Sequence, residues 1–335
     1  MFCEYRWSAS LANRIAWRGQ RKAESVELSI SGYMGVRRSV VDDYVEHVAQ
    51  AKAEGFARVW TPQMPWEPDL MTILAVVFRE VPDIEIGAAV LPIQVAHPML
   101  TAQRALTLSL ISGGRFKLGL GVNHPGMSDE LWGVPWGKPV RRMREYLDGL
   151  QPLLAGEPAN AVGEMVTTRG ALQITGAPVP DVYLAALGPQ MLHLAGRRTA
   201  GTITWMTGPK TLADHVGPSL RDAAAGAGRA DGSAKVVALL PLSVTDDTDA
   251  IRAKAAEDFA IYNTLPSYRA MLDREGFQGP EDTVLVGDEA TVTDRIKEIR
   301  DAGVDELVGS PFGDDEETVA RTRALMCKVS AAIRD

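Results

Sequence analysis

The amino-acid sequence predicts an α/β protein, a (β/α)8 TIM barrel with inserted segments. From Val26 to the C-terminus, short apolar runs of strand length alternate with segments whose apolar residues recur at helical spacing. This alternation occurs eight times, which is typical of a parallel barrel. The length of 335 residues suits one decorated barrel, although it would also hold two domains. A doubly wound sheet is the alternative, but such sheets seldom need eight parallel units.

The expected elements follow from these patterns and from Gly and Pro punctuation. The expected strands cover residues 26–33, 57–61, 84–90, 116–122, 182–187, 201–206, 235–244 and 306–308. The expected helices begin near residues 40 and 70 and then cover 98–111, 140–154, 190–197, 211–225, 249–274, 292–299 and 316–333. Pro266 is expected to interrupt the long helix. Insertions are expected at 163–178, as a hairpin, and at 266–288.

Composition excludes several classes of function. With 46% hydrophobic and 23% charged residues, the chain has the make-up of a soluble globular protein. Its formal net charge of −8 disfavours a nucleic acid or an anionic membrane as partner. Cys3 and Cys327 are too few for a disulfide framework, and no apolar run could span a bilayer. We therefore expect a cytoplasmic protein.

Residues 1–25 differ from the remainder of the chain. They carry a net charge of +3, from five basic and two acidic residues, and leave −11 for the rest. The segment lacks the continuous apolar core of a secretory signal. We expect a poorly ordered N-terminal extension without function, followed by the barrel domain at 26–335.

One strand is unusual because glycines occupy one of its faces. Phe116, Leu118 and Leu120 alternate with Lys117, Gly119 and Gly121. The bare face allows something bulky to lie against the backbone, although glycines also ease the packing of a helix on a strand. The preceding helix is expected to open at Pro98 and to close at the Gly113-Gly114 pair.

This strand runs into a turn that carries His124. In a parallel barrel, chemistry takes place at the C-terminal ends of the strands. Of the five histidines, only His124 occupies such an end in a Gly-rich context. His47, His193 and His215 fall within expected helices, where packing or surface roles are typical, and His97 is expected to cap the helix at Pro98. No histidine spacing typical of a metal site occurs, so no metal is expected.

A second stretch has the pattern of a phosphate site. A strand ends near Leu187, Gly188 turns the chain, and Pro189 is suited to open a helix. Free N–H groups at a helix start bind anions, and glycine permits close approach. A plain strand-to-helix turn would have the same sequence, so both interpretations stay open. Neither Gly-rich stretch matches a dinucleotide fingerprint or an ATP phosphate loop.

Tryptophans follow several strands that would end at one barrel mouth. Trp60 and Trp66 belong to strand two and its loop, Trp132 and Trp136 to the loop after strand four, and Trp205 to strand six. Aromatic walls suit a flat ring ligand, while some of these side chains are expected to pack in the core. Trp66, Trp132 and Trp205 are the expected substrate-pocket residues.

Three motifs together resemble the bacterial luciferase-like monooxygenase superfamily, and within it the coenzyme F420-dependent oxidoreductases. The motifs are the segments 114–121, 182–189 and 302–307, and the resemblance extends from about Val26 to the C-terminus. The resemblance implies a (β/α)8 barrel, usually dimeric, with the deazaflavin in the barrel mouth. It also implies that the cofactor phosphate lies at the turn after strand five.

The resemblance assigns roles to individual residues. It implies phosphate binding by the N–H groups of Gly188 and Gln190, and a ring-supporting bulge, often with a cis bond, at Ala89 and Val90. It places Val122, Asn123 and His124 near the ring edge, where His124 is expected to supply a proton as the catalytic acid. The remaining expected cofactor-binding residues are Thr61, Gln63 and Ala186.

One departure from the family bears on the reaction. Dehydrogenase members often carry acidic and histidine residues after strand two, where this chain has Thr61-Pro62-Gln63. Reduction of an activated C=C or C=O bond by the reduced deazaflavin is therefore the expected reaction. The alternatives are an FMN-dependent monooxygenase and a protein that binds flavin or deazaflavin without catalysing a reaction.

Overall fold

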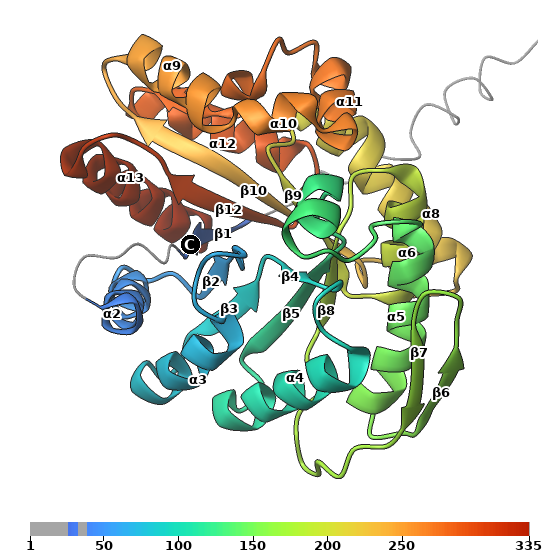
Figure 1. Cartoon of the computed structure of the whole chain (residues 1–335). Helices are drawn as coiled ribbons and strands as arrows, with labels where there is room; N and C mark the ends of the chain where they lie inside the picture. The colour runs from blue at the N-terminus through green and yellow to red at the C-terminus, as the bar shows by residue number, and fades with distance from the viewer. Residues whose placement is uncertain (1–25, 33–38, 335) are drawn as a thin grey trace, which may run out of the picture.

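The computed structural model describes residues 26–32 and 39–334, and these form a closed parallel barrel surrounded by helices (Figure 1). The strands pair in the order β1-β2-β3-β5-β8-β9-β10-β12, and β12 pairs with β1 to close the ring. Their bounds are Glu27–Ser31 (β1), Arg58–Thr61 (β2), Glu85–Ala88 (β3), Phe116–Gly121 (β5), Val182–Ala185 (β8), Gly201–Trp205 (β9), Lys235–Val244 (β10) and Glu306–Pro311 (β12). The expected (β/α)8 fold is confirmed.

A helix or helical segment follows each barrel strand and packs outside the sheet. The helices are α2 (Val40–Ala53), α3 (Leu70–Glu80), α4 (Pro98–Ser112), α5 (Pro139–Leu154), α6 (Pro189–Arg198), α7 (Pro209–Thr211), α8 (Gly217–Gly226), α9 (Thr248–Asp258), α10 (Ala260–Thr264), α11 (Pro266–Glu275), α12 (Glu289–Asp301) and α13 (Glu316–Arg334). Shorter helical segments are η1 (Gly126–Leu131), η2 (Leu212–Val216) and η3 (Pro280–Thr283). In the described part of the chain, no helix is both long enough and apolar enough to cross a membrane.

Helix α4 shows how local sequence sets the ends of an element. Pro98 occupies its first position, and the Nδ1 atom of His97 accepts a hydrogen bond from the N–H of Met99 at 3.2 Å. Gly113 ends the helix in the left-handed conformation, with φ +65°. The expected Pro start, Gly end and histidine cap are confirmed.

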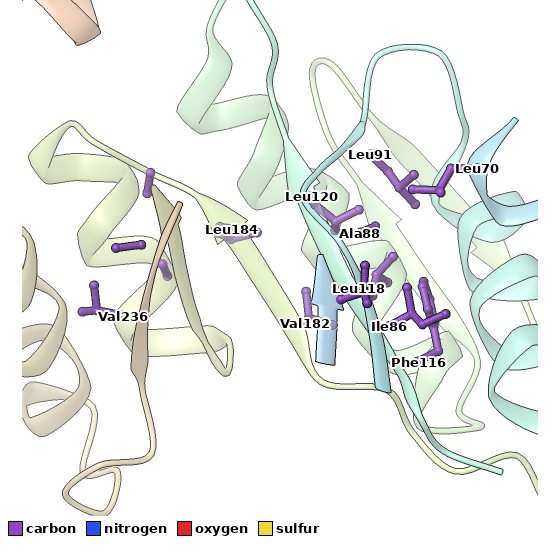
Figure 2. Packing of buried hydrophobic residues seen from close by; sticks show 14 of the residues in the cluster. Leu70, Ile86, Ala88, Leu91, Phe116, Leu118, Leu120, Val182, Leu184 and Val236 are labelled. Atoms are coloured by element: carbon purple, nitrogen blue, oxygen red, sulfur yellow. The ribbon is translucent and has the colours of Figure 1, made fainter. Parts of the chain in front are cut away.

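The main core lies between the strands and the helices. On β5, Phe116, Leu118 and Leu120 point into this layer, where Figure 2 shows them near Ile86 and Ala88 of β3. These side chains are buried completely or almost completely. Burial of the side chains on the helix-facing side of each strand stabilises the barrel mainly through the hydrophobic effect.

The barrel interior holds a second, smaller core. Its buried members are Trp60, Tyr183, Ile203, Val237, Leu239 and Val308. The rings of Trp60 and Tyr183 meet edge to face, with centroids 5.4 Å apart. The barrel is therefore filled in its middle, as parallel eight-stranded barrels are.

A charged cluster closes the N-terminal end of the barrel. The buried Glu306 carboxylate accepts hydrogen bonds from Ser29 at 2.5 Å, Trp60 at 2.7 Å and Arg58 at 2.5 Å. Burial raises the pKa of Glu306, and the Arg58 guanidinium opposes this effect. Because Arg58 also pairs with Glu85, each buried charge has a partner of opposite sign.

Several element boundaries differ from the sequence-based expectation. The expected strand at 84–90 ends at Ala88 and resumes as β4 (Leu91–Pro92), which pairs with β5. The expected hairpin lies earlier than 163–178, because β6 (Ala159–Val162) pairs with β7 (Thr167–Gly170). Residues 1–25 and the end of the first expected strand, at Tyr33, lie outside the described residues.

The expected long helix at 249–274 is divided into three. Phe259 separates α9 from α10, and Leu265 adopts an extended conformation directly before Pro266, as the residue before a proline tends to do. The expected insertion at 266–288 contains α11, η3 and a further strand, β11 (Leu285–Gly287), which pairs with the outer part of β10. Three residues were too short a run to identify this strand from the sequence.

His47 of α2 gives the fold a pH-dependent stability. Its Nε2 lies 3.1 Å from the carbonyl oxygen of Ser31, which can only accept, so this nitrogen carries the proton. Burial lowers the pKa of His47 to about 4, and the nearby Arg323 charge acts in the same direction. Between pH 6.5 and 4 the unfolded chain therefore binds a proton that the folded chain does not.

We expect His47 to destabilise the fold as the pH falls from about 6.5 to about 4, by on the order of 3 kcal/mol. The His47→Gln variant keeps a donor for Ser31 and loses the titration, so its stability should vary less over this range. Urea unfolding at several pH values measures the difference. His193→Gln, on the exposed side of α6, is the matched control. Parallel pH dependence of wild type and His47→Gln would contradict the prediction.

Gly119 of β5 lies close to the backbone of the neighbouring strand β3. A Cβ atom at this position would collide with the carbonyl oxygen of Ala88 and would lie 2.9 Å from Cδ1 of Ile203. One of these contacts is to backbone, which cannot turn away as a side chain can. The absence of a side chain at Gly119 therefore sets the separation of β3 and β5.

We expect Gly119→Ala to lower the free energy of unfolding by about 1–3 kcal/mol, because the strands must separate to admit the methyl group. Gly126→Ala is the matched control, since a Cβ atom there meets nothing within 4 Å. Chemical denaturation of both variants measures the effect. An unchanged denaturation midpoint in Gly119→Ala would show that β3 can shift without loss of stability.

Candidate functional site

A bulge between β3 and β4 projects at the C-terminal end of the barrel. The Ala89–Val90 peptide bond is cis, as the resemblance implied. The N–H of Ala89 donates to the carbonyl oxygen of Thr61 at 2.7 Å, and the N–H of Ile93 donates to that of Gly121 at 3.0 Å. Hydrogen bonds to β2 and β5 therefore hold the bulge on both sides.

The bulge occupies the bare face of β5. A Cβ atom on Gly121 would lie 2.5 Å from Cγ2 of Val90 and 3.5 Å from Cβ of Ala185. The bulky group expected against these glycines is thus the protein's own bulge. Val90 is half-buried and packs on the interior core, so its outer surface forms a platform on which a ring could lie.

Three expected cofactor-binding residues direct their side chains away from the barrel mouth. Thr61 is fully buried and its hydroxyl bonds to that of Tyr44 on α2. Val122 packs against the main core, and Ala186 is buried in the same core. Strand alternation explains this, because a shift of one residue moves a side chain to the other face. Gly121 and Ala185 occupy the positions next to Val90.

The polar side chains of Gln63 and Asn123 form hydrogen bonds to the backbone near their own positions in the chain. The Gln63 side chain donates to the carbonyl oxygen of Met64 at 2.8 Å and accepts from the N–H of Leu70 at 2.7 Å, so it holds the loop and the start of α3. Asn123 has φ +54°, and its side-chain oxygen accepts from the N–H of His124 at 2.8 Å. Asn123 therefore turns the chain and orients His124.

His124 lies directly after β5 and is half-buried. Its ring contacts that of Tyr268 on α11, with centroids 5.8 Å apart. Within the described residues, neither ring nitrogen has a hydrogen-bond partner, so both are free for a ligand. Burial lowers the pKa of His124 below 6.5. In the absence of a ligand, the neutral imidazole is therefore favoured at neutral pH.

An aromatic arc extends from His124 across the insertion after β10. Tyr268 contacts Tyr262, with centroids 4.7 Å apart, and Tyr262 contacts Phe259 at 6.3 Å. Phe259 in turn meets the edge of Trp205 at 5.8 Å. These ring contacts connect the ends of β5 and β9 through Phe259, α10 and α11. No sequence pattern indicated a functional position for Phe259, Tyr262 or Tyr268, because each lies in an expected helix.

The three expected substrate-pocket tryptophans differ in setting. Trp205 belongs to the aromatic arc, Trp132 is half-buried directly after η1, and Trp66 is 69% exposed. No ring contact joins the three in the described part of the chain. The indole N–H of Trp136 donates to the carbonyl oxygen of Val122 at 3.0 Å, which is a structural role.

The turn from β8 into α6 has the features of an anion site. Gly188 is the N-cap residue and Pro189 the first helical residue, and no side chain caps the helix. A Cβ atom on Gly188 would meet nothing within 4 Å, so the space in front of this turn is open. Among the described residues, no hydrogen bond engages the N–H of Gly188 or Gln190. Both amides, together with the helix dipole, are available to a phosphate.

The remaining histidines do not gather as metal ligands. His97 bridges the start of α4 and the carbonyl oxygen of Thr167, at 2.9 Å, and His193 is exposed. In the described segments, no three His, Cys, Asp or Glu side chains are placed to hold a metal ion. His215 lies 2.8 Å from the carbonyl oxygen of Leu187, beside the anion site, a contact that helical periodicity alone does not indicate.

Comparisons with known proteins identify the family of the chain. The family model for the luciferase-like monooxygenases matches residues 28–306. The 5,10-methylenetetrahydromethanopterin reductase of Methanolobus tindarius is 28% identical over 82% of this chain and 92% of its own length.

Two solved structures share the fold. The coenzyme F420-dependent tetrahydromethanopterin reductase of Methanopyrus kandleri has a TM-score of 0.75 and 24% identity over 91% of this chain and 98% of its own. The oxygenating constituent of 3,6-diketocamphane monooxygenase from Pseudomonas putida, in complex with FMN, has a TM-score of 0.72 and 18% identity over 92% of this chain and 98% of its own. Since the family model matches far more than half of the chain, the protein belongs to the luciferase-like monooxygenase family.

Proposed function

We propose that this protein is a coenzyme F420-dependent oxidoreductase that transfers a hydride between the deazaflavin and a small organic substrate. The observation that carries the proposal is the joint position of the Val90 platform, the open Gly188 turn and His124 at the C-terminal ends of the barrel strands. The named activity of the Methanolobus tindarius relative and the F420 dependence of the Methanopyrus kandleri enzyme support it.

The residues present fit such a cofactor. Its ring would lie on Val90, where the bulge is held from both sides, and its phosphate would accept hydrogen bonds from the N–H groups of Gly188 and Gln190. When bound, the deazaflavin supplies or accepts the hydride. The protein contributes orientation, a partly enclosed aromatic wall and a proton.

His124 is the proposed proton donor for reduction of an activated C=C or C=O bond. Hydride delivery leaves negative charge on the substrate, and a proton from an adjacent acid neutralises it. Burial favours neutral His124, whereas the developing anion favours the imidazolium form. Burial lowers the pKa of His124 below 6.5 before the ligand binds, so the fraction of protonated His124 increases as the pH falls below neutrality. We therefore expect the rate of substrate reduction to increase as the pH is lowered. In the reverse direction, neutral His124 would accept the proton.

A second candidate function is FMN-dependent monooxygenation. It is favoured by the likeness to the FMN complex of the camphane monooxygenase constituent, which has the same fold. An open phosphate turn and a ring platform would also accept FMN. A direct measurement of binding affinity distinguishes coenzyme F420 from FMN as the cofactor.

We expect the purified full chain to bind coenzyme F420 more tightly than FMN in the same buffer. Fluorescence titration of each cofactor gives the two dissociation constants, and oxygen consumption with reduced FMN tests the second function. Equal or tighter binding of FMN, with oxygen uptake, would replace the first proposal by the second.

We expect His124→Ala to keep its affinity for the cofactor and to lose about a hundredfold or more in the rate of hydride transfer, because the acid is removed. Single-turnover oxidation of bound, reduced cofactor by a working acceptor measures this rate. The control is His193→Ala, an exposed histidine on α6 that contacts none of the residues assigned to proton transfer. A His124→Ala rate within a few-fold of wild type would assign the proton to water or to another group.

A cytoplasmic homodimer remains a prediction from the sequence and from the family resemblance. Light scattering of the purified chain measures its mass in solution directly.

A further inference from the structure

We infer that His215 is a positioning residue that directs the Gly188 amide toward the cofactor phosphate. The inference rests on the proposed function and adds to it a residue that does not itself touch the ligand. His215 belongs to η2, after β9, and is 8% exposed. Its Nε2 lies 2.8 Å from the carbonyl oxygen of Leu187. A carbonyl oxygen only accepts, so Nε2 carries the proton and donates it.

Peptide geometry connects this hydrogen bond to the anion site. The carbonyl group of Leu187 and the N–H of Gly188 belong to one planar peptide unit. In the described residues only the Ala89–Val90 bond is cis, so the Leu187–Gly188 bond is trans and its C=O and N–H point in opposite directions. A donor that holds the oxygen on the side of η2 therefore holds the N–H on the opposite side. Among the residues that the structure describes, that N–H has no hydrogen-bond partner, and the space around Gly188 is open.

Neighbouring contacts restrict the turn further. The Thr202 hydroxyl lies 3.0 Å from the carbonyl oxygen of Leu184 and 3.3 Å from that of Ala186, so the end of β8 is held from β9. The next carbonyl toward α6, that of Leu187, is held by His215 instead of Thr202. Without this donor, the Leu187–Gly188 peptide could rotate, and its amide would lose its fixed direction.

Helix α6, which begins after Gly188, packs closely against α8, which follows the His215 segment. A Cβ atom on Gly196 of α6 would collide with the carbonyl oxygen of Leu220 on α8. Segment η2 continues directly into α8, so this contact also restricts the position of the segment that carries His215 relative to α6. The N–H of Gly217 donates to the carbonyl oxygen of Leu212, which is the wide turn of a π-helix, and such turns often occur at functional sites.

The test compares a ligand with and without its phosphate. The probes are coenzyme F420 and the same deazaflavin without the phosphate and the groups beyond it, each titrated by fluorescence. The ratio of their dissociation constants reports the contribution of the phosphate site. We expect wild type to prefer the phosphorylated probe strongly. His215→Leu and His215→Phe should lower this preference about tenfold, the scale of one hydrogen bond to a charged group.

His215→Gln is the rescue variant, because its amide can donate from nearly the position of Nε2 and should keep most of the preference. Gly188→Val blocks the open space directly and should abolish the preference. Melting curves confirm that each variant is folded. All four variants should bind the phosphate-free probe as wild type does, which a general structural defect would not allow.

The possible outcomes separate the inference from the proposed function. If wild type binds both probes equally, the phosphate placement in the proposed function is wrong, and the inference fails with it. If wild type prefers the phosphorylated probe and His215→Leu and His215→Phe do so equally, only the inference is overturned. Loss of preference in His215→Gln as well would show that the donated hydrogen bond is not the cause.

A measurement on wild type is independent of whether the variants fold. Imidazole ¹⁵N NMR of the holoprotein identifies which ring nitrogen of His215 carries the proton. A protonated Nε2 that exchanges slowly with solvent is expected, and an unprotonated Nε2 would overturn the inference.

Discussion

The close approach of backbone to backbone between β3 and β5 is the constraint on which the site depends. Gly119 admits the carbonyl oxygen of Ala88, and Gly121 admits the side chain of Val90. Any larger residue at either position would push the bulge away from the strand. Because β2 and β5 both accept hydrogen bonds from the N–H groups around the bulge, these two strands together with β3 set its position. The surface that would support a ring is therefore part of the barrel wall.

The two ends of the barrel are built from different chemistry. At the N-terminal end, Arg58 and Glu306 form a buried, hydrogen-bonded cluster, and above it Trp60 and Tyr183 fill the interior. At the C-terminal end, the ring nitrogens of His124 and the amide of Gly188 have no hydrogen-bond partner among the described residues. This division agrees with the general rule that stability and chemistry occupy opposite ends of such barrels.

The sequence was sufficient to predict the fold class and most elements, because periodicity and Gly or Pro punctuation act locally. It was not sufficient to predict which face of a strand points inward. Barrel strands are buried on both faces, so alternation of polar and apolar residues is weak. The family resemblance placed Thr61, Val122 and Ala186 among the cofactor-binding residues, whereas their side chains point toward the helices. The contact of His124 with Tyr268 depends on a tertiary approach that no local pattern encodes.

The wide turn at Leu212–Val216 has a consequence for how relatives of this chain should be aligned. Each residue of an α-helix advances the side-chain direction by about 100°. Deleting one residue from this turn would restore a regular helix and rotate the residues before the deletion relative to those after it. A histidine matched column by column to His215 in a chain without the extra residue would then point away from the carbonyl of Leu187. In this segment, a residue of a homologue is equivalent to His215 only if the homologue also has the same number of residues in the turn.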